Sequence, residues 1–196
     1  MSLQENKKVI EKVILVAVCE GDEVETSDSL LELKELCKTA GAEVVGEITQ
    51  NLDRRNPGTY VGTGKVEEIR ELIYETGATG IVCDDELSPA QMRNLADILD
   101  TQVMDRTLII LDIFASRAGT SEGKIQVELA QLRYEMTRLT GFGVNMSRVG
   151  GTSAGGGGAI GTRGPGEKKL ELDKRLIAGR ITQLKKELAD VVQHRE

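Results

Sequence analysis

The chain is poor in the residues that most metal and catalytic sites use. It has one histidine, His194, so histidine-dependent triads and histidine metal sites are not expected. Its three cysteines, Cys19, Cys37 and Cys83, are scattered, odd in number and outside any C-x-x-C pair, which argues against a disulfide framework and a thiolate zinc site. No apolar run approaches the length of a membrane span, and the first residues lack the apolar stretch of a signal peptide. We therefore expect a cytoplasmic protein.

Charge is distributed unevenly along the 196 residues, whose net charge is −7. Residues 1–116 contain 11 Lys and Arg against 23 Asp and Glu, a net −12, whereas residues 117–196 contain 14 against 9, a net +5. The asymmetry predicts an acidic globular domain (1–116) followed by a basic appendage (117–196). The appendage either contacts a polyanion or carries solvated, lysine-rich helices.

The acidic half alternates between strand and helix patterns. An apolar run at 13–18 suits a buried parallel strand, and the leucines of 27–39 have the spacing of an amphipathic helix. Further predicted elements are strands at 43–48, 80–83 and 102–105 and helices at 65–75 and 88–99. Because parallel strands require helical crossovers, the pattern predicts an α/β fold with a small parallel sheet flanked by helices. The pattern does not specify the order of the strands.

Three polar clusters in this half are candidate sites. Gly62-Thr-Gly64-Lys65 opens a helix and is either an anion-binding turn or a tight turn without a ligand; it lacks the spacing of a phosphate loop. Asp84-Asp85-Glu86 follows a strand, where carboxylates bind metals or act in catalysis, although acids before a helix also serve as partners of the helix dipole. Arg54-Arg55 lies in a polar stretch that is either an RNA-binding loop or an exposed connection.

The basic half has the pattern of two paired helices. Residues 107–114 are interpreted as a buried helix. After it, the apolar positions are spaced alternately by four and three residues in two segments, as in a coiled-coil seam. These positions are 125, 129, 132, 136 and 139 in the first segment and 170, 177, 181, 184, 188 and 191 in the second. The pattern predicts an antiparallel coiled-coil hairpin with arms at about 120–140 and 167–196.

A glycine-rich loop at 141–166 would join the two arms of this hairpin. It matches two nucleotide-binding patterns, G-x-G-x-x-G at 156–161 and the glycine spacing of a phosphate loop at 161–166. The first lacks a preceding strand and a following helix, and the second has Glu167 where a phosphate loop needs lysine. The segment 141–166 is therefore either a flexible linker or a binding loop.

The composition of the segment favours RNA. Residues 139–166 hold eleven glycines, Arg148, Arg163 and no acidic residue, and Lys168 and Lys169 follow directly. Small side chains let backbone amides and the two arginines follow an irregular, phosphate-lined surface, and such segments commonly order on binding. The predicted RNA-binding residues are Arg148, Arg163, Lys168, Lys169, Gly155, Gly156, Gly157, Gly158, Gly161, Gly164 and Gly166.

Five motifs in order together resemble the N-terminal region of the HflX family of ribosome-associated GTPases. They are TYVGTGKVEEI (59–69), DELSPAQMRNL (85–95), DRTLIILDIFA (105–115), EGKIQVELAQL (122–132) and GTRGPGE (161–167). The resemblance covers nearly the whole chain. It departs at Lys168, where the family usually has threonine, and at Lys174, where it usually has arginine; both changes keep or add positive charge.

The resemblance implies a cytoplasmic factor that binds the large ribosomal subunit and its ribosomal RNA, separates stalled or idle ribosomes, and hydrolyses GTP with Mg²⁺ in the full-length protein. Family members insert the hairpin tip near the peptidyl-transferase centre, which by position carries over to residues 141–166. No G-x-x-x-x-G-K-[ST] motif occurs in the chain. We therefore expect a catalytically inactive N-terminal piece without a cofactor of its own, whose partners are the ribosome and its own C-terminal GTPase domain.

Two other functions stay open. In the first, the α/β domain binds ATP or another nucleotide at Gly62, Gly64 and Lys65 and regulates the GTPase domain. In the second, the hairpin is a coiled coil that contacts protein and positions the GTPase domain.

Overall fold

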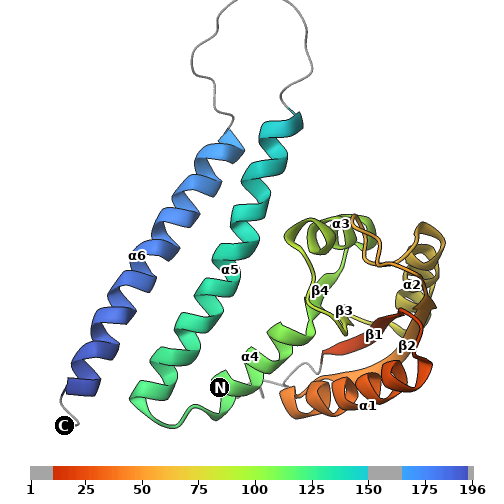
Figure 1. Ribbon diagram of the computed structural model, residues 1–196, viewed down its shortest axis with the longest axis horizontal. Helices are drawn as coiled ribbons and strands as arrows, with labels where there is room; N and C mark the ends of the chain where they lie inside the picture. The colour runs from red at the N-terminus through yellow and green to blue at the C-terminus, as the bar shows by residue number, and fades with distance from the viewer. Residues whose placement is uncertain (1–10, 150–164, 194–196) are drawn as a thin grey trace, which may run out of the picture. The chain divides into compact units, whose positions relative to one another are not determined.

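The computed structural model describes residues 11–149 and 165–193 (Figure 1). By its internal contacts the chain divides into two compact units, Met1–Leu87 with Gln91–Ile113, and Ser88–Ala90 with Phe114–Glu196. Among the described helices, none combines the length and the apolar character that crossing a bilayer requires.

The first unit is built on a four-stranded sheet whose paired strands are all parallel. The strands are β1 (Lys12–Cys19), β2 (Glu43–Asn51), β3 (Gly80–Cys83) and β4 (Gln102–Asp105), in the order β2-β1-β3-β4. The connecting helices are α1 (Glu23–Ala40), α2 (Thr63–Thr76) and α3 (Pro89–Leu99), and α4 (Arg106–Arg117) follows β4. The predicted α/β fold with a small parallel sheet is confirmed.

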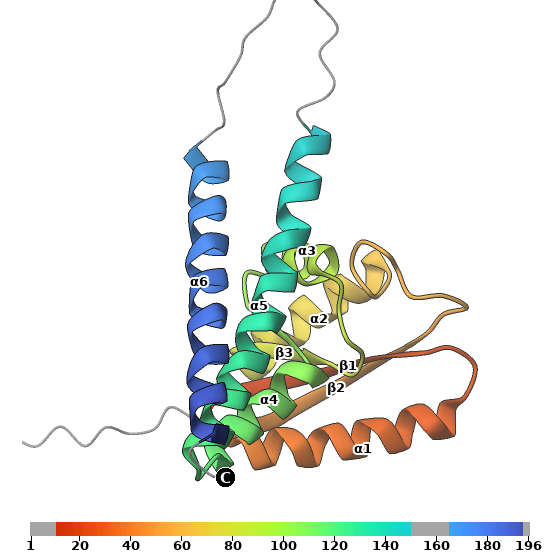
Figure 2. The ribbon, with the colours of Figure 1, turned by 60° about the vertical axis from the view of Figure 1, so that its left-hand side comes forward.

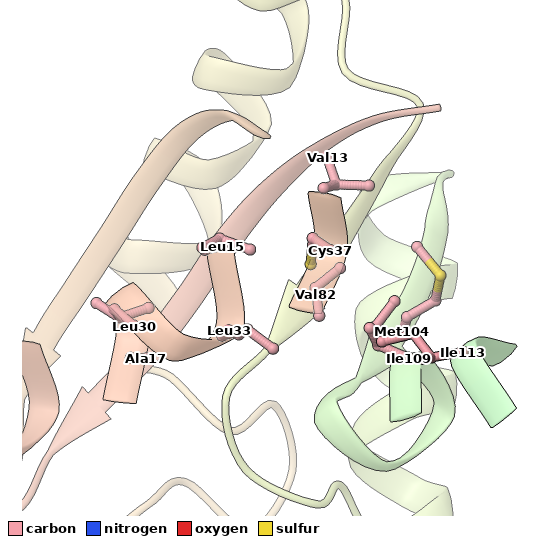
Figure 3. Close-up of a cluster of buried hydrophobic side chains, with 10 residues drawn as sticks. All are labelled: Val13, Leu15, Ala17, Leu30, Leu33, Cys37, Val82, Met104, Ile109 and Ile113. Atoms are coloured by element: carbon pink, nitrogen blue, oxygen red, sulfur yellow. The ribbon is translucent and has the colours of Figure 1, made fainter. Parts of the chain in front are cut away.

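Both faces of the sheet are covered by helices, α1 and α4 on one face and α2 and α3 on the other (Figure 2). Because β1 is central, seven of its eight residues are buried. Figure 3 shows the core under α1 and α4. Its side chains come from β1, β3 and β4 and from both helices: Val13, Leu15, Ala17, Leu30, Leu33, Cys37, Val82, Met104, Ile109 and Ile113. Residues 107–114 thus belong to a helix, as predicted.

Local sequence signals set the ends of α1. The Asp22 side chain accepts hydrogen bonds from the amides of Val24 and Glu25 at 2.9 and 3.0 Å, which begins the helix four residues before the predicted start at 27. Gly41 ends it with a φ of 94°, a left-handed conformation that favours glycine.

The second unit contains two long helices, α5 (Ser121–Val149) and α6 (Pro165–Gln193), which run antiparallel and side by side in both views (Figures 1 and 2). Leu129 and Leu184 are buried, with 5% and 1% of their surface exposed. The other described seam positions, 125, 132, 136, 139, 177, 181, 188 and 191, are half-buried. An ion pair joins the helices, with Arg180 Nε donating to Glu128 Oε1 at 2.8 Å. The coiled-coil geometry around a glycine-rich tip stays a prediction.

The predicted start of the tip loop at 141 is wrong, because α5 continues through Val149. The prediction ended the first arm at about 140, just before Gly141 and Gly143. Each glycine costs only about 1 kcal/mol in a helix interior. Extending a helix that already has several turns is far easier than nucleating one, so α5 passes both glycines. At the other end, Pro165 opens α6, a position where its missing N–H costs nothing.

Candidate functional site at the carboxyl edge of the sheet

The carboxyl ends of β1 and β3 form the switch point of this sheet. The two strands are neighbours, and the chain leaves them toward opposite faces, to α1 after β1 and to α3 after β3. Open parallel sheets bind ligands in the crevice that such a divergence creates. The predicted acidic cluster, Asp84 to Glu86, follows β3 at this point.

The connection from β2 to α2 crosses this edge. We call residues 52–61 the strap. It begins with the Leu52 amide, which donates to the carbonyl of Cys19 at the end of β1. It is closed on itself by two hydrogen bonds of 2.9 Å between the backbones of Asn56 and Tyr60. It reaches α3, where the side-chain amide of Gln91 donates to the Asn56 carbonyl at 2.7 Å and that of Asn94 to the Gly58 carbonyl at 2.8 Å.

Arg55 of the strap is held between two carboxylates from different strands. Its Nη2 lies 3.0 Å from Asp85 Oδ1, in the connection after β3, and 3.5 Å from Glu20 Oε2, in the connection after β1. Its backbone amide also donates to Glu20 Oε1 at 3.0 Å. Of the predicted pair Arg54-Arg55, the second therefore has partners within the protein, and Arg54 is exposed.

Tyr60 is the buried end of the strap, with 1% of its surface exposed. Its hydroxyl donates to Asp85 Oδ2 at 2.6 Å and accepts from the Val18 amide at 3.1 Å. Burial, and then the hydrogen bond to Asp85, raise the Tyr60 pKa, so the hydroxyl stays protonated and acts as a donor. Its φ of 67° is unusual for a residue with a large side chain. Nothing in the sequence indicated this role beyond an aromatic residue closing a polar stretch.

A second ionic group lies at the start of α4. Asp105 is fully buried and accepts hydrogen bonds from the amides of Leu87 and Leu108 at 3.1 and 3.0 Å. Arg106 Nε lies 3.4 Å from Asp84 Oδ1, and Arg106 Nη1 lies 3.2 Å from Glu32 Oε2 of α1. These contacts tie the connection after β3 to α4 and to α1.

The arrangement is suited to holding positive charge. Asp84 and Asp85 each pair with an arginine, and among the described residues no cluster of three or more metal-ligating side chains occurs. Burial raises the pKa of the Cys83 thiol well above its usual range, with the nearby Asp105, Asp85 and Asp84 adding to the effect. A neutral, buried thiol is a poor nucleophile.

A shallow hollow of ≈ 340 Å³ lies beside the strap, at the ends of β1 and β2. It is lined by Cys19, Gly21, Glu23, Asn51, Leu52 and Asp53. The Asn51 side chain donates to Glu23 Oε1 at 3.0 Å. Because Asp22 already caps the first amides of α1 and the other charged groups here are acidic, this hollow does not favour phosphate.

The predicted anion-binding turn at the start of α2 has partners of its own. The Gly62 amide donates to Gln50 Oε1 at 2.8 Å, and Lys65 Nζ donates to Glu68 Oε2 at 2.6 Å. Gly64 lies in the first turn of α2, with open space where a Cβ would be. Nucleotide binding at Gly62, Gly64 and Lys65 stays a prediction, and a phosphate would have to displace Glu68 from Lys65.

Most predicted RNA-binding residues lie outside the described residues: Gly155, Gly156, Gly157, Gly158, Gly161, Arg163 and Gly164. Arg148 lies in the last turn of α5, and Gly166, Lys168 and Lys169 lie in the first turns of α6.

Two family models match the chain. The model described as the GTP-binding GTPase N-terminal region matches residues 27–115, and the one described as the GTP-binding GTPase middle region matches 117–196. The protein named GTPase HflX from Lacrimispora saccharolytica is 63% identical over 99% of this chain. The chain belongs to the HflX family.

Within the HflX family, the chain corresponds to part of the length of its relatives. It spans 44% of the Lacrimispora saccharolytica protein and 42% of GTPase HflX from Escherichia coli, which is 43% identical over 95% of the chain. A crystal structure titled SsGBP and GDP complex superposes with a TM-score of 0.67 at 20% identity, covering 95% of this chain and 45% of that one. At this identity the structural likeness establishes the fold alone.

Proposed function

We propose that this chain is the ribosome-binding region of an HflX-type GTPase. In this proposal it binds the large ribosomal subunit and helps to split or rescue ribosomes, and the segment between α5 and α6 contacts ribosomal RNA. GTP and Mg²⁺ bind in a part of the full-length protein beyond these residues, so the 196-residue chain alone is catalytically inactive.

The observation that carries the proposal is the antiparallel pairing of α5 and α6, each of which buries one leucine, Leu129 and Leu184. Each helix has 29 residues, which at about 1.5 Å per residue makes each roughly 43 Å long. A pair of this length can carry the acid-free residues 150–164 into a narrow, phosphate-lined crevice. A short turn would be enough to join two antiparallel helices, so a segment this long suggests a role other than connection.

The charge distribution also supports RNA binding by the second unit. Residues 1–116 have a net charge of −12 and would be repelled by phosphates, whereas 117–196 have a net charge of +5. RNA contact is therefore expected through the second unit, with Arg148 and Arg163 as phosphate partners.

The test is co-sedimentation of the chain with purified large ribosomal subunits over a range of salt concentrations. An Arg148→Ala/Arg163→Ala variant should bind more weakly, and the slope of log K against log salt should fall by about 0.7 to 0.9 for each phosphate that the variant no longer binds. The control is Lys185→Ala/Lys186→Ala, which removes the same charge from exposed positions on α6. If both variants bind equally weakly, the interaction is non-specific electrostatic attraction and does not depend on Arg148 and Arg163.

A second outcome would point to the protein-contact alternative. If the chain does not sediment with large subunits at low salt, but light scattering shows self-association that a change at Leu184 abolishes, the helical pair serves protein contact instead of RNA contact.

A further inference from the structure

We propose that the strap, residues 52–61, is a latch that closes the switch-point crevice of its own sheet, with the Arg55 guanidinium occupying the place of a cationic ligand. This inference concerns the first unit and does not depend on the ribosomal role of the second.

The position of Arg55 is that of a ligand in this fold. Its two carboxylate partners, Glu20 and Asp85, belong to the connections after β1 and β3, the two strands of the switch point. One nitrogen, Nη2, lies within 3.5 Å of both carboxylates. Without a cation between them, the two negative charges would repel each other.

Residues 52–59 of the strap are held mainly by polar contacts that water can replace, whereas Tyr60 and Val61 at its end are buried. Arg55 and Glu20 are 43% and 39% exposed, so their ion pair is partly hydrated. The bonds to α3 are two hydrogen bonds from the side-chain amides of Gln91 and Asn94. Segments held by such contacts open locally at a lower free energy than the core of a sheet.

Backbone strain at Tyr60 favours release. A bulky residue with positive φ is uncommon and persists only where its surroundings impose it. Here the surroundings are the buried packing of the ring and the two hydrogen bonds of the Tyr60 hydroxyl, to Asp85 and from the Val18 amide. At the other end of the strap, Leu52 and Asp53 line the open hollow.

Opening of the strap would present Glu20 and Asp85 to solvent as an acidic crevice that requires positive charge. The requirement is electrostatic, so a divalent cation supplied from solution can take the place of the guanidinium. Ca²⁺ is the suitable probe, since carboxylate oxygens coordinate it in a flexible geometry.

The experiment is residue-resolved amide hydrogen exchange by NMR on the whole chain. The Val18 amide reports directly on the latch, because its hydrogen bond goes to the Tyr60 hydroxyl. In Arg55→Ala we expect exchange at Val18, Gly58 and Thr59 to accelerate roughly 2- to 5-fold, as for loss of a partly exposed ion pair. Amides inside β1 and β3, such as Leu15 and Val82, should exchange at the wild-type rate.

Two comparisons complete the design. Arg54→Ala removes the same charge from the adjacent exposed residue and should leave exchange unchanged. Adding Ca²⁺ should slow exchange at the strap in Arg55→Ala several-fold, while NaCl of equal ionic strength should not. Tyr60→Phe keeps the packed ring and should accelerate exchange at Val18 as well.

The latch is refuted if Arg55→Ala leaves exchange at Val18 and Gly58 at the wild-type rate, because Arg55 then holds nothing closed. It is also refuted if exchange accelerates equally in β1, β3 and the strap, since Arg55 would then stabilise the whole unit. If Ca²⁺ has no effect on the variant, Arg55 does not occupy a cation site.

Discussion

Truncating Leu184 to alanine should loosen the pairing of α5 and α6 while leaving the sheet intact. Leu184 is 1% exposed, and only Leu129 is comparably buried among the described residues of the two helices. Leu→Ala substitutions at buried sites cost about 2 to 5 kcal/mol, the sum of reduced burial and the remaining cavity. Because the neighbouring seam positions are only half-buried, their side chains can move into the space, and we expect about 2 to 3 kcal/mol, near the lower end of that range.

The measurement is hydrogen exchange by mass spectrometry on peptides from both helices, which reports the free energy of local opening. Leu176→Ala is the matched control, because Leu176 lies on the same helix with 63% of its surface exposed; it should change stability by less than about 0.5 kcal/mol. Peptides from β1 serve as an internal reference and should not change. Equal effects of the two substitutions would show that α5 and α6 do not pack through Leu184, and the two helices would then not form a stiff pair.

Three further predictions concern capping, a buried thiol and the ion pair between the long helices. Asp22→Ala should lower the free energy of unfolding of the first unit by about 1 kcal/mol in urea denaturation, because two α1 amides lose their acceptor. Asp22→Asn keeps an acceptor oxygen and should retain most of this stability. Burial raises the pKa of Cys37 from 9.0 to about 11, so the stability that the neutral thiol contributes should be present below pH 9 and be lost as the pH rises toward 11. The denaturation midpoint should fall over this pH range in the wild type. In Cys37→Ala this fall should be absent. Reversing one charge, Glu128→Arg or Arg180→Glu, should destabilise the helix pair in thermal denaturation at low salt. The double reversal should restore the stability of the helix pair. If the double variant is as unstable as the single ones, the ion pair makes no direct contribution.

The sheet could be predicted from the sequence because its signals are local. The apolar run of β1 and the short runs of β3 and β4 indicate buried strands, and the intervening helices force them to be parallel. Errors arose where two local signals competed. Ser27 looked like a helix start, but Asp22 lies earlier and caps two amides, so α1 begins at Glu23. The first arm was predicted to end at about 140, before Gly141 and Gly143, but the helix preceding them was already long enough to continue.

The candidate site was only partly predictable, because it depends on strand order. The sequence indicated Asp84 and Asp85 as an acidic cluster and Arg55 as part of a basic pair, but nothing local indicates that they meet. They come together only because β1 lies between β2 and β3, so that the connection leaving β2 must cross the ends of the other two strands. Tyr60 was missed for the same reason, since its partners lie 42 and 25 residues away.

The central place of β1 also affects how the chain is made. Among the described strands β1 comes first in the chain, yet it is flanked on both sides by later ones, and Val16 pairs with Cys83, 67 residues further on. At 5 to 20 residues per second, a ribosome needs roughly 3 to 13 s to supply that partner. For this interval the segment VILVAVC has at most one of its two edges paired.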